Sequence, residues 1–232
     1  MKPKVIFIHP LKTGGTSVRY MLLNEYGFER VMPVPMGDAF GKQDEAYPVM
    51  RGYPLQVQKT ITPETVAGYD VVMSHYDWGI VNRLPGWQVI TILRDPVEQI
   101  RSLYQYMVDR PHLFPDAAHM SALGFAYWVQ SKYGRPFLNN QTAFLSSHQQ
   151  RDYVTAVRNL QDERVSFGLL ERFEETVQRW NRRFGWSMTV EHRNKTDRPY
   201  VMDTNTRTLV QGLQKDDMML WTEATRKFGE NS

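Results

Sequence analysis

The chain has 232 residues, 41% hydrophobic and 23% charged, a composition that suits one folded domain spanning residues 1–232. Its net charge at pH 7 is only +3, so we expect no nucleic-acid partner, although a mild positive bias suits an anionic ligand. The absence of cysteine excludes disulfides and thiolate chemistry, and the six histidines show no spacing typical of zinc sites, so we expect no metal.

No apolar stretch approaches the roughly 18 residues that a membrane span needs. The first residues lead straight into an apolar run without the pattern of a signal peptide. We therefore expect a cytoplasmic protein with no membrane span, and nothing in the sequence indicates its oligomeric state.

The first readable unit is a strand, a glycine-rich loop and a helix. Residues 5–8, followed by His9, form an apolar run rich in β-branched residues, and Val18, Met21, Leu22 and Tyr26 recur at helical spacing. A glycine-rich loop before a helix gathers backbone N–H groups around an anion, and the positive end of the helix dipole assists. The phosphate-binding candidates of this loop are Lys12, Thr13, Gly14, Gly15, Thr16 and Ser17.

The order of residues in this loop differs from the Walker A motif. The lysine precedes the glycines here, whereas it follows them in G-x-x-x-x-G-K-[ST]. Taken by itself, the loop is therefore either a phosphate cradle or a tight turn with a solvated lysine.

A second strand at residues 70–75 ends in Ser74 and His75. In a parallel, doubly wound sheet the carboxyl ends of the strands line the ligand crevice, so His75 is expected on the same edge as Lys12. A histidine there is either a general base or a structural residue bonded to a neighbouring carbonyl or carboxylate.

A third strand at residues 88–94 ends in Arg94. Asp95 is a good N-cap and Pro96 suits the first position of a helix, on which Ser102 lies about two turns in. Arg94 and Ser102 are therefore candidates for a second anion site. Two anion sites on one sheet edge suggest a ligand that carries phosphates at two places.

The local signals in the rest of the chain are weaker. Residues 27–66 are broken by proline and glycine and are either surface loop or the rim of an acceptor site. Residues 164–168 predict a strand, 173–184 an amphipathic helix, and 203–228 two terminal helices. Ser121 is expected to cap a helix. The basic loop at residues 192–199 contains Lys195 and Arg198, which are candidates for closing over a phosphate.

Taken together, these motifs resemble those of PAPS-dependent sulfotransferases, nearest the heparan sulfate 2-O-sulfotransferase-like family and its short bacterial relatives. Residues 12–17 resemble the family's 5′-phosphosulfate loop, and Arg94 with Ser102 its 3′-phosphate motif. Weaker matches are Ser74-His75, Asn139-x-Gln141-Thr142, residues 168–173, and residues 194–199. Two departures are Pro10-Leu11 before the lysine, and Gln99 where the family usually has an arginine, with Arg101 nearby.

The resemblance implies a P-loop-NTPase-like, three-layer α/β fold with a mostly parallel, doubly wound sheet. It also implies transfer of a sulfuryl group from PAPS to a hydroxyl, releasing PAP. Lys12 would neutralise charge on the bridging oxygen, Arg94 and Ser102 would hold the 3′-phosphate, and His75 would take the acceptor's proton. Arg101 is not carried over.

The acceptor is the least defined part of this reading. Tyr76, Trp78, Tyr104 and Gln141 are candidates for binding it, and the three aromatic residues are equally compatible with the core. The chain shows no long basic face, which favours a small molecule, a lipid headgroup or a short saccharide over a long polyanionic glycan.

Two other functions remain open from the sequence. One is a P-loop kinase of a small metabolite that uses ATP and magnesium, with Asp95 in place of a Walker B aspartate. The other is a non-catalytic nucleotide-binding module.

Overall fold

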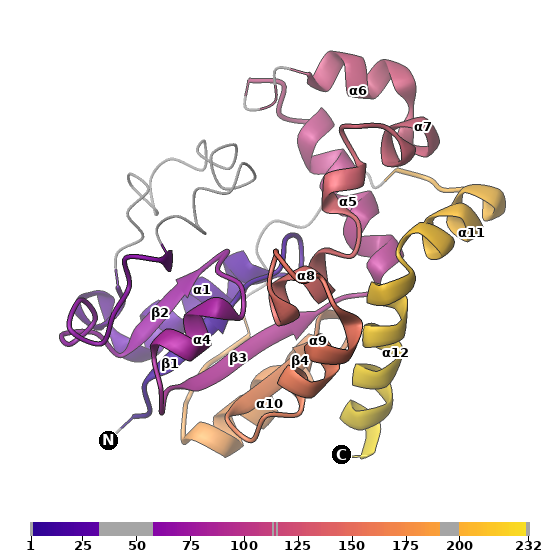
Figure 1. Cartoon of the computed structure of the whole chain (residues 1–232). Helices are drawn as coiled ribbons and strands as arrows, with labels where there is room; N and C mark the ends of the chain where they lie inside the picture. The colour runs from indigo at the N-terminus through magenta and orange to yellow at the C-terminus, as the bar shows by residue number, and fades with distance from the viewer. Residues whose placement is uncertain (1, 33–57, 113, 115, 191–199, 231–232) are drawn as a thin grey trace.

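A four-stranded parallel sheet forms the centre of the chain (Figure 1). The computed structural model describes residues 2–32, 58–112, 114, 116–190 and 200–230. Within these residues the strand order is β2-β1-β3-β4, and every neighbouring pair is parallel. The strands are β1 (Val5–Ile8), β2 (Val71–Ser74), β3 (Gln88–Leu93) and β4 (Val165–Leu169).

Both faces of the sheet are buried, which explains why its strands are nearly continuous apolar runs. Side chains alternate between the faces along a strand. Val5 and Phe7 of β1 therefore join one hydrophobic cluster, whereas Ile6 and Ile8 join the cluster on the opposite face.

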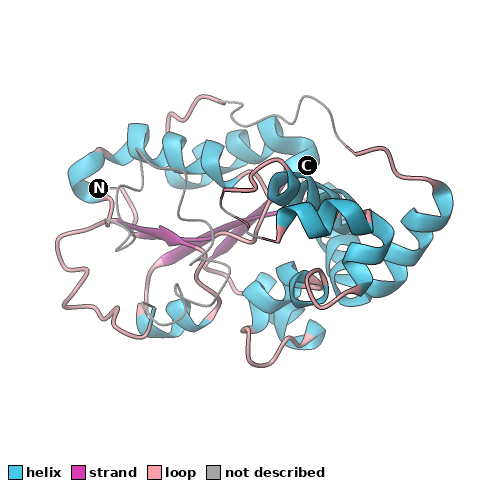
Figure 2. Ribbon diagram, turned by 90° about the horizontal axis from the view of Figure 1, so that it is seen from above, coloured by secondary structure: helices cyan, strands magenta, loops and turns pink. Residues whose placement is uncertain are grey.

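Helices cover both faces of the sheet, as the view in Figure 2 shows. One face packs against α1 (Gly15–Tyr26) and α10 (Phe173–Phe184). The other face packs against α4 (Gly79–Arg83), α8 (Asn140–Ser146), α9 (Tyr153–Leu160) and α12 (Lys215–Glu230). The predicted three-layer, doubly wound α/β class is therefore confirmed.

A third hydrophobic cluster lies beyond the carboxyl edge of the sheet. It joins α5 (Pro96–Val108), α6 (Ala117–Leu123), α7 (Phe125–Gln130) and α11 (Thr204–Leu213). In Figure 1, α5 begins at the end of β3 and carries α6 and α7 away from the sheet. Short 3-10 turns lie at Phe28–Arg30, Arg135–Phe137 and Leu170–Arg172.

The strand order creates a switch point at the carboxyl ends of β1 and β3. The chain runs from β1 to β2 on one side, and from β3 to β4 on the other. In open α/β sheets, ligands bind in the crevice outside such a point. The loops that leave β1 and β3, which carry Lys12 and Arg94, meet there.

The secondary structure matches the sequence analysis where local signals are strong. The four predicted strands, the helix at 173–184 and the two terminal helices are present. Asp95 caps α5, accepting from the amides of Val97 and Glu98 at 2.8 and 3.1 Å. The prediction for Ser121 is wrong: it lies inside α6, and Gly124 precedes α7.

The N-termini of α8 and α12 cap each other. The Asp217 carboxylate of α12 accepts from the amides of Gln141 and Thr142 at 3.0 and 2.7 Å. In return, Asn139 Oδ1 accepts from the amides of Asp216 and Asp217, both at 3.1 Å. Asp217 is fully buried, and burial raises the pKa of its carboxyl to about 6, partly offset by the amide bonds.

This raised pKa predicts an unusual dependence of stability on pH. The folded chain holds the Asp217 proton more tightly than the unfolded chain, so the contribution of Asp217 is greatest at low pH and is lost as pH rises. A carboxyl that titrates at about 6 when folded and about 4 when unfolded loses about 3 kcal/mol across that interval.

Urea unfolding of the wild type and of Asp217→Asn between pH 4 and 7 measures this effect. We expect the wild type's advantage over the variant to shrink as pH rises. Asp203→Ala is the control of opposite sign, because hydrogen bonds from Thr206 lower the pKa of the Asp203 carboxyl at the N-cap of α11. A constant difference between wild type and Asp217→Asn would contradict the prediction.

Candidate functional site

The loop between β1 and α1 is held in a tight, left-handed conformation. Lys12 has a φ of 60° and Gly14 a φ of 85°, values that glycine adopts readily and lysine rarely. Thr13 is fully buried, and its hydroxyl donates to the carbonyl of Pro10 at 2.8 Å. The Thr13 side chain therefore shapes the loop, and only its backbone is left for a ligand.

Gly15 makes room for a histidine. A Cβ atom at this position would lie 1.8 Å from Nε2 of His9. The His9 ring has little freedom to move, because it stacks between Phe7 and His75, at 5.3 and 4.3 Å between ring centroids. The second glycine of the loop is thus required by close packing of an imidazole ring.

Gly15→Ala is expected to destabilise the chain by about 1–3 kcal/mol, the usual cost of overpacking. Gly212→Ala in α11 is the matched control: no atom lies within 4 Å of the new methyl group. That change should stabilise by up to about 1 kcal/mol, because alanine favours helices. Equal unfolding midpoints in urea for the two variants would contradict the packing argument.

The start of α1 presents backbone donors toward the crevice. The amides of Ser17 and Val18 bond to the carbonyl of Gly14, at 3.1 and 3.4 Å. Within the described part of the chain, no acceptor bonds the amides of Gly14 and Gly15. Ser17 is buried and Thr16 is half-buried. The first turn of α1 therefore offers the arrangement that an anion needs.

Lys12 and Arg94 lie side by side. The Arg94 guanidinium donates from Nη1 to the carbonyl oxygen of Lys12 at 3.1 Å. The ammonium of Lys12 lies 4.2 Å from the centre of the Tyr106 ring, and the guanidinium of Arg110 lies 4.1 Å from the same centre. Three cations thus gather at the end of β1 and β3, where an anion would be strongly favoured.

The charges of this group shift each other's protonation. Burial lowers the pKa of Lys12 to about 8, and the nearby charges of Arg110 and Arg94 contribute. Burial also lowers the pKa of Arg94. A bound anion would relieve this mutual repulsion.

Ser102 lies on α5, half-buried and one helical turn before Tyr106, so both residues share a face of the helix. Arg101 is turned elsewhere: it forms an ion pair with Glu98 and donates to the carbonyl of Tyr200 at 3.2 Å. Lys195 and Arg198 lie outside the described residues.

His75 is held in one orientation at the end of β2. Its Nδ1 lies 2.8 Å from the carbonyl oxygen of His9, and its ring stacks on the His9 ring. A carbonyl can only accept, so Nδ1 carries the proton and Nε2 keeps its lone pair. Burial lowers the pKa of His75 to about 4, and the charges of Arg19 and Lys12 act in the same direction.

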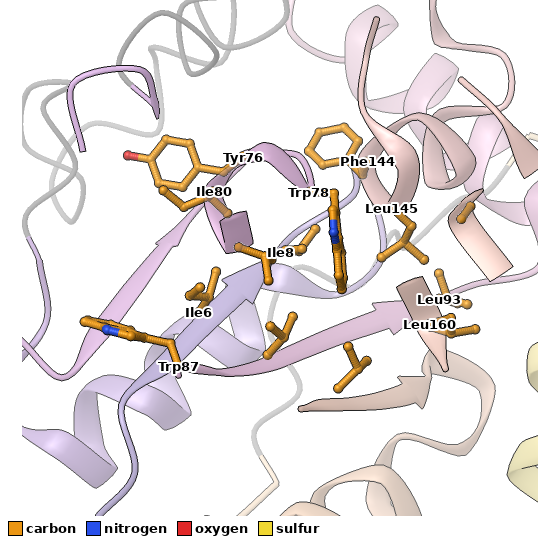
Figure 3. Packing of buried hydrophobic residues seen from close by; sticks show 14 of the residues in the cluster. Ile6, Ile8, Tyr76, Trp78, Ile80, Trp87, Leu93, Phe144, Leu145 and Leu160 are labelled. Carbon is orange, nitrogen blue, oxygen red and sulfur yellow. The ribbon is translucent and has the colours of Figure 1, made fainter. Parts of the chain in front are cut away.

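All four candidates for acceptor binding are buried in this structure. Tyr76 and Trp78 belong to the cluster under α4 and α8, where Figure 3 shows Trp78 among Ile8 and Leu145. Tyr104 packs with α6 and α7. The amide of Gln141 bonds to the backbone of Arg94. Three of these side chains therefore serve packing, and Gln141 holds Arg94.

Three further residues of the site were missed by the sequence analysis: His9, Arg19 and Arg110. Burial lowers the pKa of His9 and of Arg19, and the Arg19 charge acts on both histidines. Two sequence signals were available: His9 directly follows a strand, and Arg19 follows Gly15 by one helical turn.

Among the comparisons with known proteins, only the search of solved structures finds matches. No protein-family model matches the chain, and a search of curated proteins finds no match. Among solved structures, the chain is similar to a sulfotransferase from Alicyclobacillus acidocaldarius, with 15% identity and a TM-score of 0.48. The match covers 94% of this chain and 93% of that one. At this level of similarity, the neighbour assigns no chemistry to the residues of this chain.

No described helix is both long enough and apolar enough to cross a membrane. Within the same residues, no group of three or more histidine, aspartate or glutamate side chains is placed to hold a metal ion.

Proposed function

We propose that this chain is a sulfotransferase that moves a sulfuryl group from PAPS to a hydroxyl of its acceptor and releases PAP. The observation that carries the proposal is the contact between the two basic residues Lys12 and Arg94. The Arg94 guanidinium donates to the carbonyl of Lys12, so both residues are close enough to bind one adenosine that carries phosphates at two positions.

The role of each residue follows from its position. The first amides of α1 and the charge of Lys12 would hold the 5′-phosphosulfate, and Arg94 with Ser102 the 3′-phosphate. His75 has a free Nε2 lone pair and stays neutral at physiological pH, which suits a general base. The acceptor oxygen would bond to sulfur as the sulfur–oxygen bond to the phosphate breaks, and its proton would pass to His75.

The N-cap role of Asp95 weighs against the kinase alternative, which needs this carboxylate to bind a metal. Oδ1 of Asp95 already accepts from two amides at the start of α5, as an N-cap. A magnesium ligand at this position would compete with the cap. We therefore keep ATP with magnesium as an alternative ligand to test and do not propose a kinase.

Thermal denaturation with candidate nucleotides tests the proposal. A ligand at about 100 times its dissociation constant stabilises by about 2.7 kcal/mol. We expect stabilisation by PAP without magnesium, and its loss in Arg94→Ala. A response only to ATP with magnesium would overturn the proposal in favour of the kinase.

Turnover is tested separately with labelled PAPS and a panel of hydroxyl-bearing acceptors. Small molecules, lipid headgroups and short saccharides are the classes that we propose. PAP binding without label transfer to any of them would favour the non-catalytic module. The cytoplasmic location and the single-domain organisation stay predictions from the sequence.

A further inference from the structure

We propose that Asn140 and Gln141, the first two residues of α8, fix the distance between the Lys12 loop and Arg94, with Gln99 as their partner. The three would be positioning residues that make the site selective for a ligand with two phosphates. This inference rests on the proposed function for its ligand and goes beyond it in assigning the selectivity to a buried hydrogen-bond network.

The first half of the network holds the residue next to Lys12. The amide of Leu11 donates to Asn140 Oδ1 at 3.0 Å, and the carbonyl of Leu11 accepts from Gln99 Nε2 at 2.7 Å. The same Nε2 lies 3.2 Å from Asn140 Oδ1, which joins the two side chains. Both backbone polar groups of Leu11 are therefore fixed by buried side chains.

The second half treats Arg94 in the same way. The amide of Arg94 donates to Gln141 Oε1, and Gln141 Nε2 donates to the carbonyl of Arg94, both at 2.8 Å. One side chain thus satisfies both backbone groups of the residue that directly follows β3.

The network joins two chain segments that the sheet no longer connects. β1 and β3 are neighbours up to Ile8 and Thr91, and their chains separate beyond this point. Two adjacent residues in the first turn of α8 bind one segment each, so this turn sets the spacing of the segments. Asp217 anchors that turn through its two amide bonds.

The burial of Gln99 favours positioning over simple packing. Its side chain is fully buried, and Oε1 has no described hydrogen-bond partner. An apolar side chain would avoid this desolvation cost. The opposite amide orientation would set Oε1 against two acceptor oxygens, so the donor contacts to Leu11 and Asn140 fix the orientation that is present.

The test compares one ligand that contacts both the Lys12 loop and Arg94 with two ligands that contact one of them each. PAP carries both phosphates, whereas adenosine 5′-monophosphate and adenosine 3′-monophosphate carry one. Two linked contacts reinforce each other only if their spacing matches the site. A change in the distance between the Lys12 loop and Arg94 should therefore weaken the binding of PAP more than that of either monophosphate. Dissociation constants are measured by titration calorimetry for Gln99→Met, Asn140→Ala and Gln141→Met.

We expect each variant to bind PAP about tenfold more weakly, with a much smaller change for either monophosphate. Asn181→Ala is the matched control. The Asn181 side chain, on α10, bonds to both backbone groups of Met188, at 2.8 and 3.1 Å. This variant should leave all three dissociation constants unchanged. Equal weakening of all three ligands in the network variants would overturn the proposal.

A second readout needs no nucleotide and separates this inference from the proposed function. Hydrogen exchange of the Leu11 amide should accelerate in Asn140→Ala, and that of Arg94 in Gln141→Met, each by more than the accompanying loss of global stability accounts for. If the wild type does not bind PAP, the proposed function fails, and hydrogen exchange still tests whether the network holds the two segments in place. Unchanged exchange at both amides would refute the positioning role by itself.

Discussion

His75→Phe is expected to lower kcat by about a hundred- to ten-thousandfold, the range that a positioned general base contributes. Phenylalanine keeps a ring against His9 and Phe144, which His75 contacts at centroid distances of 4.3 and 6.2 Å. The variant therefore loses the proton acceptor and retains an aromatic surface. The dissociation constant for PAP should stay unchanged, because His75 would act on the acceptor.

The pH profile of kcat/KM gives an independent readout of the same role. Only the neutral imidazole accepts a proton, so activity should be lost as pH falls through the pKa of His75, about 4, and should not decline near 6.5. His119→Ala is the control, because His119 is exposed on α6 and its ring packs only against the edge of Tyr133 among the described contacts. Turnover at the wild-type rate in His75→Phe would show that His75 is not the general base.

The strands and the positions of Lys12 and Arg94 after them were predictable because their signals are local. A strand buried on both faces has to be apolar along its length, and such runs precede both His9 and Arg94. The start of α5 was equally clear, since Asp95 and Pro96 are an N-cap and a first helical residue. The order of these units along the chain was then enough to place both cations on one edge.

The contacts that failed to be predicted join residues far apart in the sequence. Gln141 meets Arg94 across 47 positions, and Asn140 meets Leu11 across 129. No periodicity within a segment encodes such a pairing. The burial of the aromatic candidates was unpredictable for a related reason: an aromatic residue near a strand end suits a binding site and a core equally, and only the helix packed above it buries it.

The departure at Gln99 illustrates how a substitution changes meaning once its neighbours are known. From the sequence it is a missing positive charge. In the structure the side chain lies fully buried on α5 and bonds to the backbone just before Lys12. Arg110, two residues beyond the end of α5 and packed on the Tyr106 ring, contributes a cation at the site that the sequence analysis did not assign.

Lys12→Met is expected to lower kcat by about a hundred- to a thousandfold, the usual effect of removing one preorganised group that stabilises developing charge. Methionine keeps the unbranched apolar part of the side chain and loses the ammonium, which is the group that lies over Tyr106. Lysine and methionine are both unbranched at Cβ, so the left-handed backbone at this position, with a φ of 60°, should cost about the same with either side chain. The loop should therefore keep its shape.

The pH profile distinguishes loss of charge from loss of shape. The pKa of Lys12 is about 8 in the free chain, so wild-type kcat/KM should decline above that pH, and Lys12→Met should lack this decline. Arg110→Met should move the decline to higher pH, because the Arg110 charge is one cause of the lowered pKa. A decline that stays in place in both variants would mean that another group limits the rate. Lys12 would then serve to bind the donor, without acting on the charge that develops during transfer.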